Sequence, residues 1–285
     1  MTRHRFNRRM ALFLLLFFSV TSCGKSKKDA EADADQEAAP TLPSDATLTM
    51  SADPLKEDAD SIELSFSQGE ESRGSNHLAA YLAAVAASGT MGLVLAAPAA
   101  ALKAAFAQTP TRQDDGTWLW SYTFTYGGVS YTTALTGTKL SATSASFSFA
   151  VTRSPADDHG CCDKFVWLEG TTSSATAGSW TINDHTAPTT KAANLKVDWD
   201  FPQDTEKDLR VTLKKQPDAG SEWGVDGFVR SQTSGTTRTL TVDKDPGNSG
   251  ALVIAWDQST QAGSMTIEDG TKTCWDTALA NVTCP

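Results

Sequence analysis

Beyond residue 117 the sequence alternates between apolar and polar residues, and this period of two constrains the fold more than any other feature. Trp118, Trp120, Tyr122 and Phe124 fall on one face of an extended chain, and the residues between them are mostly Ser and Thr. A Gly-Gly pair at 127–128 supplies a hairpin turn, and an alternating return segment follows. The pattern predicts an antiparallel sheet with an aromatic inner face and a hydroxylated outer face.

Similar apolar segments recur at near-regular spacing, with Gly, Pro, Asp and Ser between them. They lie at 118–126, 129–135, 147–151, 165–167, 180–182, 195–199, 209–213, 225–229, 240–242, 252–256 and 265–267. We therefore predict a mainly β domain of about eleven strands, an antiparallel meander arranged as a barrel, half-barrel or sandwich. Most of these segments are too short for the strands of a membrane pore.

One hexapeptide of this region occurs twice. Ala-Gly-Ser-Trp-Thr-Ile at 177–182 reappears at 262–267 with Met in place of Trp, and Asp184 or Asp269 follows two residues later. Because short β motifs converge easily, the repeat indicates a reused hairpin rather than a duplicated domain.

An alanine-rich stretch precedes the strands and carries no formal charge from His77 to Leu102. We predict one or two helices, at about 76–87 and 91–107, joined at 88–90 and packed on the sheet. Together with the strands they form one domain over 76–285. The length would also permit a membrane span, but alanine is weakly hydrophobic and Pro98 interrupts the pattern.

The amino terminus has the layout of an export signal, with four arginines in the first nine residues and an apolar run at 11–20. The run ends Val-Thr-Ser-Cys at 20–23, which resembles the lipobox of bacterial lipoproteins. The resemblance implies that residues 1–22 are removed and that Cys23 carries diacylglycerol, which would place the protein in the bacterial cell envelope, anchored in membrane lipid. Gly24, rather than Asp, follows the cysteine and implies the outer membrane.

All 34 acidic residues lie after the signal, against 20 of the 24 basic ones, so the remaining chain has a formal charge of −14. Such a chain repels phosphate backbones, and nucleic acid is not an expected partner. Residues 23–75 are acidic and poor in large apolar side chains, which predicts a flexible tether. A coil of some fifty residues would hold the domain about 40 Å from its anchor. Ile62, Leu64 and Phe66 alternate like a short strand that could join a sheet edge.

Four cysteines remain besides Cys23, an even number that predicts disulfides in an exported protein. We favour a local bridge between Cys274 and Cys284, which leaves Cys161 and Cys162 as a vicinal pair or free thiols; cross-pairing of the two sets is the main competitor. The cysteine doublet lies among Asp and His residues, but it lacks the spacing of a structural zinc site. We expect no metal and no cofactor.

The segment 246–253, Pro-Gly-Asn-Ser-Gly-Ala-Leu-Val, resembles the nucleophile loop of chymotrypsin-like and HtrA-type proteases. That resemblance would make Ser249 the nucleophile of a serine hydrolase. However, Ala251 replaces the second glycine after the serine, and no histidine has the sequence context of that family. Pro, Gly and Asn are equally the residues of a turn between strands. We therefore expect a protein that is not an enzyme.

These features together predict an envelope lipoprotein with a helix-capped β domain. Two roles follow for it. The domain could hold an apolar ligand between helices and sheet, with Trp118, Trp120, Tyr122 and Phe124 as lining, or these side chains could fill the core of an adhesion or structural protein that binds a protein partner. Helices together with about eleven strands resemble the architecture of the half-barrel lipoprotein carriers of the bacterial envelope, without a shared sequence motif.

Overall fold

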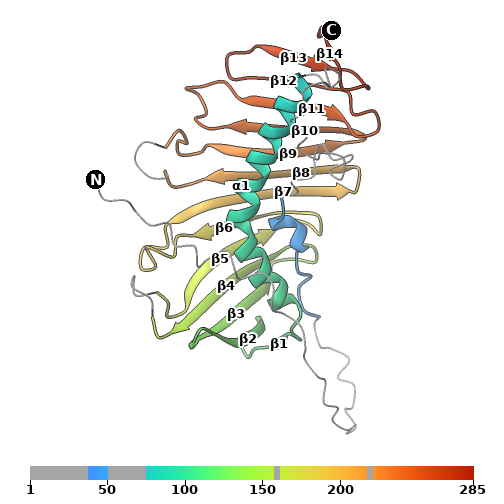
Figure 1. Cartoon of the computed structure of the whole chain (residues 1–285). Helices are drawn as coiled ribbons and strands as arrows, with labels where there is room; N and C mark the ends of the chain where they lie inside the picture. Colours follow the sequence, from blue (N-terminus) through green and yellow to red (C-terminus); the bar gives the residue numbers. More distant parts are fainter. Residues whose placement is uncertain (1–37, 51–74, 157–160, 217–220) are drawn as a thin grey trace, which may run out of the picture. The chain divides into compact units, whose positions relative to one another are not determined.

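The structure is a computed structural model that describes residues 38–50, 75–156, 161–216 and 221–285. Its main element is one antiparallel sheet in which each of fourteen strands pairs with the next one in the sequence (Figure 1). The sheet does not close: β1 forms one edge and β14 the other. The predicted antiparallel meander is confirmed, and among its three expected arrangements the sheet is neither a closed barrel nor a sandwich.

A short 3-10 helix and one α-helix precede the strands. The elements are η1 (Asp45–Leu48), α1 (Ser75–Phe106), β1 (Thr111–Arg112), β2 (Trp118–Tyr126), β3 (Val129–Lys139), β4 (Ala145–Ser154), β5 (Phe165–Thr172), β6 (Ala177–Asn183), β7 (Ala193–Gln203), β8 (Glu206–Leu213), β9 (Phe228–Ser234), β10 (Thr237–Asp243), β11 (Leu252–Asp257), β12 (Gly263–Thr266), β13 (Lys272–Trp275) and β14 (Asn281–Val282).

The eleven predicted segments correspond to β2 through β12, and three strands were missed. β1, β13 and β14 contain two to four residues each, too few to show an alternation of apolar and polar side chains. One predicted boundary is wrong. The segment proposed at 225–229 becomes a strand only from Phe228, because Val225 lies in the preceding turn with half of its side chain exposed.

A β-bulge changes which side chain of β5 enters the core. Val151 pairs with Phe165 and Phe149 pairs with Leu168, so β5 has one residue more than β4 between the two pairs. The extra residue places Leu168, which is fully buried, on the inner face with Phe165, while Trp167 is only partly buried. The sequence alternation alone had predicted Trp167 for that face.

The alanine-rich stretch is helical, which confirms the prediction of one or two helices: it forms α1, whose halves Ser75–Gly92 and Val94–Phe106 do not meet at the predicted joint of 88–90. The helix instead bends by 47° between Gly92 and Val94. Among the described residues no single helix is long and apolar enough to cross a membrane, and the two halves of α1 meet that test of length and composition only together.

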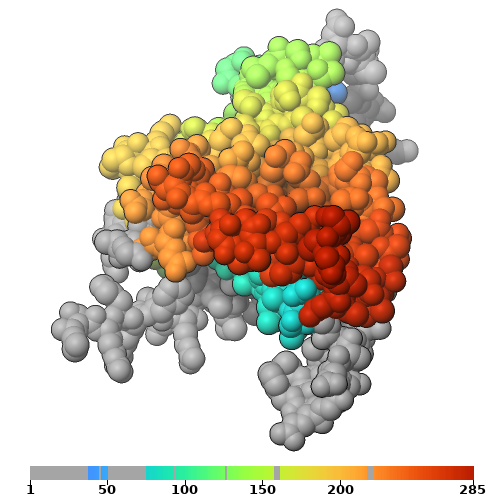
Figure 2. Space-filling model, turned by 90° about the horizontal axis from the view of Figure 1, so that it is seen from above, coloured from blue at the N-terminus to red at the C-terminus, as the bar shows by residue number. Residues whose placement is uncertain are grey.

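α1 lies across one face of the sheet, which we call the inner face (Figure 1). At its start, the Asn76 side chain donates to the Cys274 carbonyl at 3.1 Å, and the His77 ring meets Trp275 edge-on at 5.6 Å. Near its end, the Tyr122 hydroxyl on β2 donates to the carbonyl of Ala101 at 3.3 Å. Figure 2 shows the first turns of α1 beside the last strands. The helix therefore links the two edges of an open sheet.

The core lies between α1 and the inner face, and its large side chains are accommodated by glycines on adjacent strands. Gly178 pairs with Trp199 and Gly263 with Trp275, and a Cβ on either glycine would lie 2.5 Å from the facing indole. Gly178 and Gly263 are equivalent positions of the hexapeptide repeat. The repeat therefore marks places where a strand leaves room for a tryptophan of its neighbour.

Residues 38–50 are packed on the domain, which corrects the predicted tether over 23–75. Thr47, Leu48 and Met50 are each less than 5 % exposed, and the Trp180 indole donates to the Thr47 hydroxyl at 3.1 Å. Pro40 lies against Gly137 on the inner face. The sequence predicted a tether because large apolar residues are sparse here. The few that are present, among them Leu48 and Met50, are buried in the domain. Residues 23–37 and 51–74, with the proposed strand at 62–66, lie outside the described residues.

Candidate functional site

The four aromatic residues predicted as ligand lining pack against other side chains. Trp118 and Trp120 belong to the buried core, at 9 % and 3 % exposure. The Phe124 ring stacks between Tyr122 and Tyr131, with centroid distances of 5.8 and 5.0 Å. Two surface hollows of about 380 and 310 Å³ are lined by other residues. The arrangement is that of a filled core at Trp118 and Trp120, as the alternative interpretation had predicted.

The side of α1 that points away from the sheet is apolar and exposed. Leu78, Leu82 and Val94 are 51 %, 58 % and 46 % exposed, and alanines occupy most of the other exposed positions. Lys103 is the only formally charged residue of the whole helix. We call this surface the helix outer face. An exposed apolar surface of this length makes the helix outer face a candidate interaction site.

A second feature lies on the opposite, outer face of the sheet. It is the hollow of about 380 Å³ over β3 to β6, whose outward side chains form two rows across the four strands. We call it the hydroxyl hollow. One row consists of Thr136, Ser148, Glu169 and Thr181. The other consists of Thr138, Ser146, Thr171 and Ser179.

Charged side chains continue the outer face beyond the hydroxyl hollow. Lys196 and Asp198 form an ion pair of 2.7 Å on β7. Arg230 on β9 binds Asp208 on β8 through two nitrogens, and Gln232 also donates to Asp208 at 3.2 Å. Hydrogen bonding to Asp208 raises the pKa of Arg230 above its usual value. These carboxylates are paired with cations, and the described residues contain no group of three or more His, Cys, Asp or Glu that could hold a metal ion.

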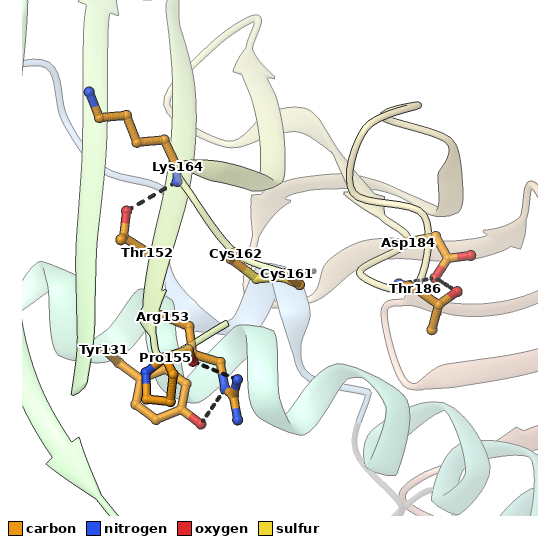
Figure 3. The surroundings of a disulfide bond; sticks show 9 residues. All are labelled: Tyr131, Thr152, Arg153, Pro155, Cys161, Cys162, Lys164, Asp184 and Thr186. Carbon is orange, nitrogen blue, oxygen red and sulfur yellow. Dashed lines mark hydrogen bonds between the residues drawn. A yellow bond between two sulfur atoms is a disulfide. The ribbon is translucent and has the colours of Figure 1, made fainter. Parts of the chain in front are cut away.

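The favoured bridge between Cys274 and Cys284 is present, and Cys161 and Cys162 form a vicinal pair, one of the two alternatives left open for them. Cys274 and Cys284 are joined, with their Cα atoms 5.2 Å apart, and Cys161 is joined to Cys162. Figure 3 shows the vicinal pair after β4 and the Arg153 side chain, which donates to the carbonyl of Pro155. The Arg153 amide donates to the Cys162 carbonyl at 2.9 Å. Cys161 is buried, and the pair lies between β4 and β5 in the sequence. The Asp and His residues directly before it, at 157–159, lie outside the described residues.

Ser249 lies in the turn between β10 and β11, as the turn interpretation predicted. Its hydroxyl donates to the main-chain carbonyl of Asp245 at 3.4 Å, and this is its only side-chain partner among the described residues. His77 packs on Trp275 and His185 is exposed in the turn after β6. The histidine that a serine hydrolase needs beside its nucleophile is therefore not found on Ser249 in the described part of the chain.

Cys23, predicted to carry the lipid, lies outside the described residues.

The sequence analysis did not predict the helix outer face or the hydroxyl hollow, for different reasons. The absence of charge from His77 to Leu102 was visible, but the number of apolar side chains left exposed depends on the packing of α1. The Ser and Thr alternation was also visible, but the hollow exists only where four strands place these residues side by side.

Comparisons with known protein families, with curated protein sequences and with solved structures find no match for this chain.

Proposed function

We propose that this protein is a lipid-anchored envelope protein, without enzymatic activity, that lies on its membrane through the helix outer face. The observation that carries the proposal is the exposed, uncharged surface of α1 formed by Leu78, Leu82 and Val94. The proposed occupant of this surface is the lipid bilayer to which Cys23 would be attached. The protein would thus have one face on lipid and the outer face of its sheet turned away from it.

The length of chain between anchor and domain supports this arrangement. From Cys23 to Ala38, the first described residue, there are fifteen residue steps, which span at most about 50 Å when fully extended. Residues 38–50 then run along the inner face of the sheet, beside α1: the Met50 carbonyl oxygen lies 3.7 Å from the position of a Cβ at Gly92. A lipid on Cys23 would therefore pull the α1 side of the domain toward the bilayer.

Charge supports the same orientation. The chain after the signal has a formal charge of −14, which disfavours an anionic lipid surface. The helix outer face has no acidic residue, so it is the surface that can approach lipid at the lowest electrostatic cost. Burial of the exposed halves of Leu78, Leu82 and Val94 would contribute roughly 3 kcal/mol. This energy supports weak, reversible binding that flotation at millimolar lipid detects, and it adds to the binding energy of an acyl anchor.

The experiment is flotation of residues 24–285, which lack the signal and the acylated cysteine but keep every described residue. Vesicles of phosphatidylcholine and phosphatidylglycerol at 3:1 are the probe. We expect a reproducible bound fraction, and we expect Leu78→Glu with Leu82→Glu to lower the partition coefficient at least tenfold. Both leucines are more than half exposed, so their substitution leaves the core unchanged.

A matched control replaces two equally exposed apolar residues in turns away from α1, Leu140→Glu with Val225→Glu, at 60 % and 50 % exposure. This control should bind vesicles within twofold of the unchanged protein. Equal binding by the control and the helix variant would overturn the proposal, as would no binding at all. A dimer in solution that the helix variant dissociates would also overturn it, because the surface would then belong to a second copy.

The anchor itself has a separate test. In the full chain produced in a bacterium, Cys23→Ala should move the protein from the membrane fraction to the soluble fraction after a high-salt wash. Retention of this variant in the membrane despite the wash would contradict lipid attachment at Cys23 without bearing on the helix outer face.

A further inference from the structure

The edge of the sheet at β2 lacks the features that usually keep strand edges from pairing. β1 pairs only with Trp118 and Leu119, so from Trp120 to Tyr126 the outer side of β2 has no partner strand among the described elements (Figure 1). Exposed edges are normally protected by charged side chains, by proline, by a bulge or by a very short length. This segment contains no charged residue and no proline, and its register with β3 is continuous.

The opposite edge, at β14, has such protection. β14 is only two residues long. The Asn281 side chain accepts a hydrogen bond from the Asn76 amide at 3.1 Å, so the start of α1 lies against this edge. The disulfide between Cys274 and Cys284 ties down the chain that follows β14. Of the two edges of the open sheet, the one at β2 is therefore the edge that offers a long template to another strand.

The pairing of β2 with β3 determines which main-chain groups face this edge. The turn at 127–128 makes Tyr126 and Val129 a hydrogen-bonded pair, so the even-numbered residues of β2 bond β3. The odd-numbered residues face away from β3, as at Thr117, whose carbonyl accepts a bond of 2.8 Å from the preceding turn. Three amides and three carbonyls without a main-chain partner among the described residues thus face the edge, those of Ser121, Thr123 and Thr125.

The same segment is complementary to a second copy of itself. Residues 121–125 are nearly the same in both directions, with hydroxyl side chains at the odd positions and aromatic ones at the even positions. In an antiparallel pair centred on Thr123, each copy would donate three main-chain hydrogen bonds and accept three. Tyr122 would lie opposite Phe124 of the second copy, in a non-hydrogen-bonded pair where side chains are closest and aromatic pairs are stabilising.

The distribution of charge also favours a second copy at this edge. No charged residue occurs from Thr117 to Thr138, a range that covers β2 and most of β3, although the chain after the signal has a formal charge of −14. Two copies that meet at β2 therefore place no like charges opposite each other across the new pair of strands. Most other parts of this acidic chain would repel their own copy.

We propose that two copies of this protein associate by antiparallel pairing of their β2 edges into one continuous sheet. The two-fold axis of such a pair is perpendicular to the sheet, so both α1 helices lie on the same side of it. Both helix outer faces would then meet one bilayer, which agrees with the proposed function, but the pairing of strands does not rest on it. Because few side chains take part, the dimer is weak in solution, and attachment of both copies to one membrane favours it.

The test is analytical ultracentrifugation of residues 24–285 from micromolar to millimolar concentration. We expect a monomer–dimer equilibrium within this range. Thr123→Lys places two like charges opposite each other at the centre of the pair and should weaken dimerisation at least tenfold, and Thr123→Glu should do the same. An equimolar mixture of the two variants should dimerise again, because unlike charges then face each other. Restored dimerisation would also show that both variants are folded.

The matched control is Thr132→Lys. Thr132 is exposed on β3 opposite Thr123, and its substitution removes the same hydrogen bond of 3.0 Å one strand away from the edge. Dimerisation of this control should stay within twofold of the unchanged protein.

A monomer throughout the range, a dimer that Thr123→Lys leaves intact, equal losses in the two lysine variants, or no dimer in the mixture would overturn the proposal. A dimer that Leu78→Glu with Leu82→Glu dissociates would assign the contact to the helix outer face and overturn it too. No vesicles are present, so a monomer here leaves the flotation result of the membrane proposal untouched.

Discussion

The Trp180 indole donates a hydrogen bond to the hydroxyl of Thr47, 3.1 Å away and 133 positions earlier in the chain. Trp180 is fully buried at the centre of the sheet, and Thr47 belongs to η1, in the segment expected to be part of a tether. This bond holds η1 on the inner face of the sheet.

Replacement of Thr47 by Val should destabilise the domain by about 1–3 kcal/mol, because the buried indole N–H would lose its partner while the volume is kept. The urea midpoint would fall accordingly, and amides of 38–50 would exchange hydrogen faster. Thr41→Val, at an exposed position of the same segment, should change the free energy of unfolding by less than about 0.5 kcal/mol. Equal effects of the two variants would show that the bond to Trp180 is not what holds this segment.

Gly170→Ala should be strongly destabilising, since a Cβ there would overlap with the Trp180 ring and with the Ser179 carbonyl oxygen. We expect a loss of about 1–3 kcal/mol or more from overpacking. Gly89→Ala is the matched control, because apart from the neighbouring helix backbone no atom lies within 4 Å of a Cβ at this helical position. That change should raise stability by about 0.5–1 kcal/mol. Thermal melts of both variants check the two signs together.

Asp184 should stabilise the fold in a pH-dependent manner. Burial alone would raise its pKa, but hydrogen bonds from Lys215 at 2.5 Å and from Thr186 outweigh burial and lower the pKa to about 2. A folded-state pKa below the unfolded value means that the stabilisation is present above about pH 4 and is lost as the pH falls toward 2. Asp184→Asn should therefore cost about 1–2 kcal/mol at pH 7, with the difference from the unchanged protein shrinking below pH 4.

The control for Asp184 is its repeat counterpart, Asp269, which is exposed and accepts a bond from the Thr271 amide at 2.7 Å. Asp269→Asn should cost less than half as much at pH 7. Urea titrations at pH 7, 5 and 3 give the comparison, and a constant difference for Asp184→Asn across these values would refute the role of its ionisation.

Loss of the disulfide between Cys274 and Cys284 should lower the free energy of unfolding by about 2–3 kcal/mol, from the entropy of a loop of ten residues. β13 and β14 form the edge on which Asn76 and His77 of α1 rest, so the double variant Cys274→Ser with Cys284→Ser should also loosen the first turn of the helix. Hydrogen exchange of 75–80 measures this effect. Unchanged exchange there would show that β12 holds the helix without the bridge.

Local periodicity predicted the strands well because each strand carries its own signal. In β2 and β4 apolar residues occupy every second position. Trp118, Trp120 and Phe149 are among them, and all three are buried as expected. The alternation gave a wrong result at the bulge of β5, where one extra residue shifts the register with β4. It also missed β14, which is too short to alternate. The aromatic face was recognised, but whether its side chains fill a core or line a cavity depends on how closely α1 approaches.

The sequence by itself determined that this protein is a β meander with an uncharged helix before it, since both follow from the spacing of apolar residues along the chain. It also carries the lipobox-like signal at Cys23, which needs no fold to be read. Only the tertiary structure decided that residues 38–50 join the inner face, that Leu78 and Leu82 remain exposed, and that the hydroxyls of β3 to β6 gather in one hollow. These are relations between distant segments, and such relations arise from packing, which a local pattern does not encode.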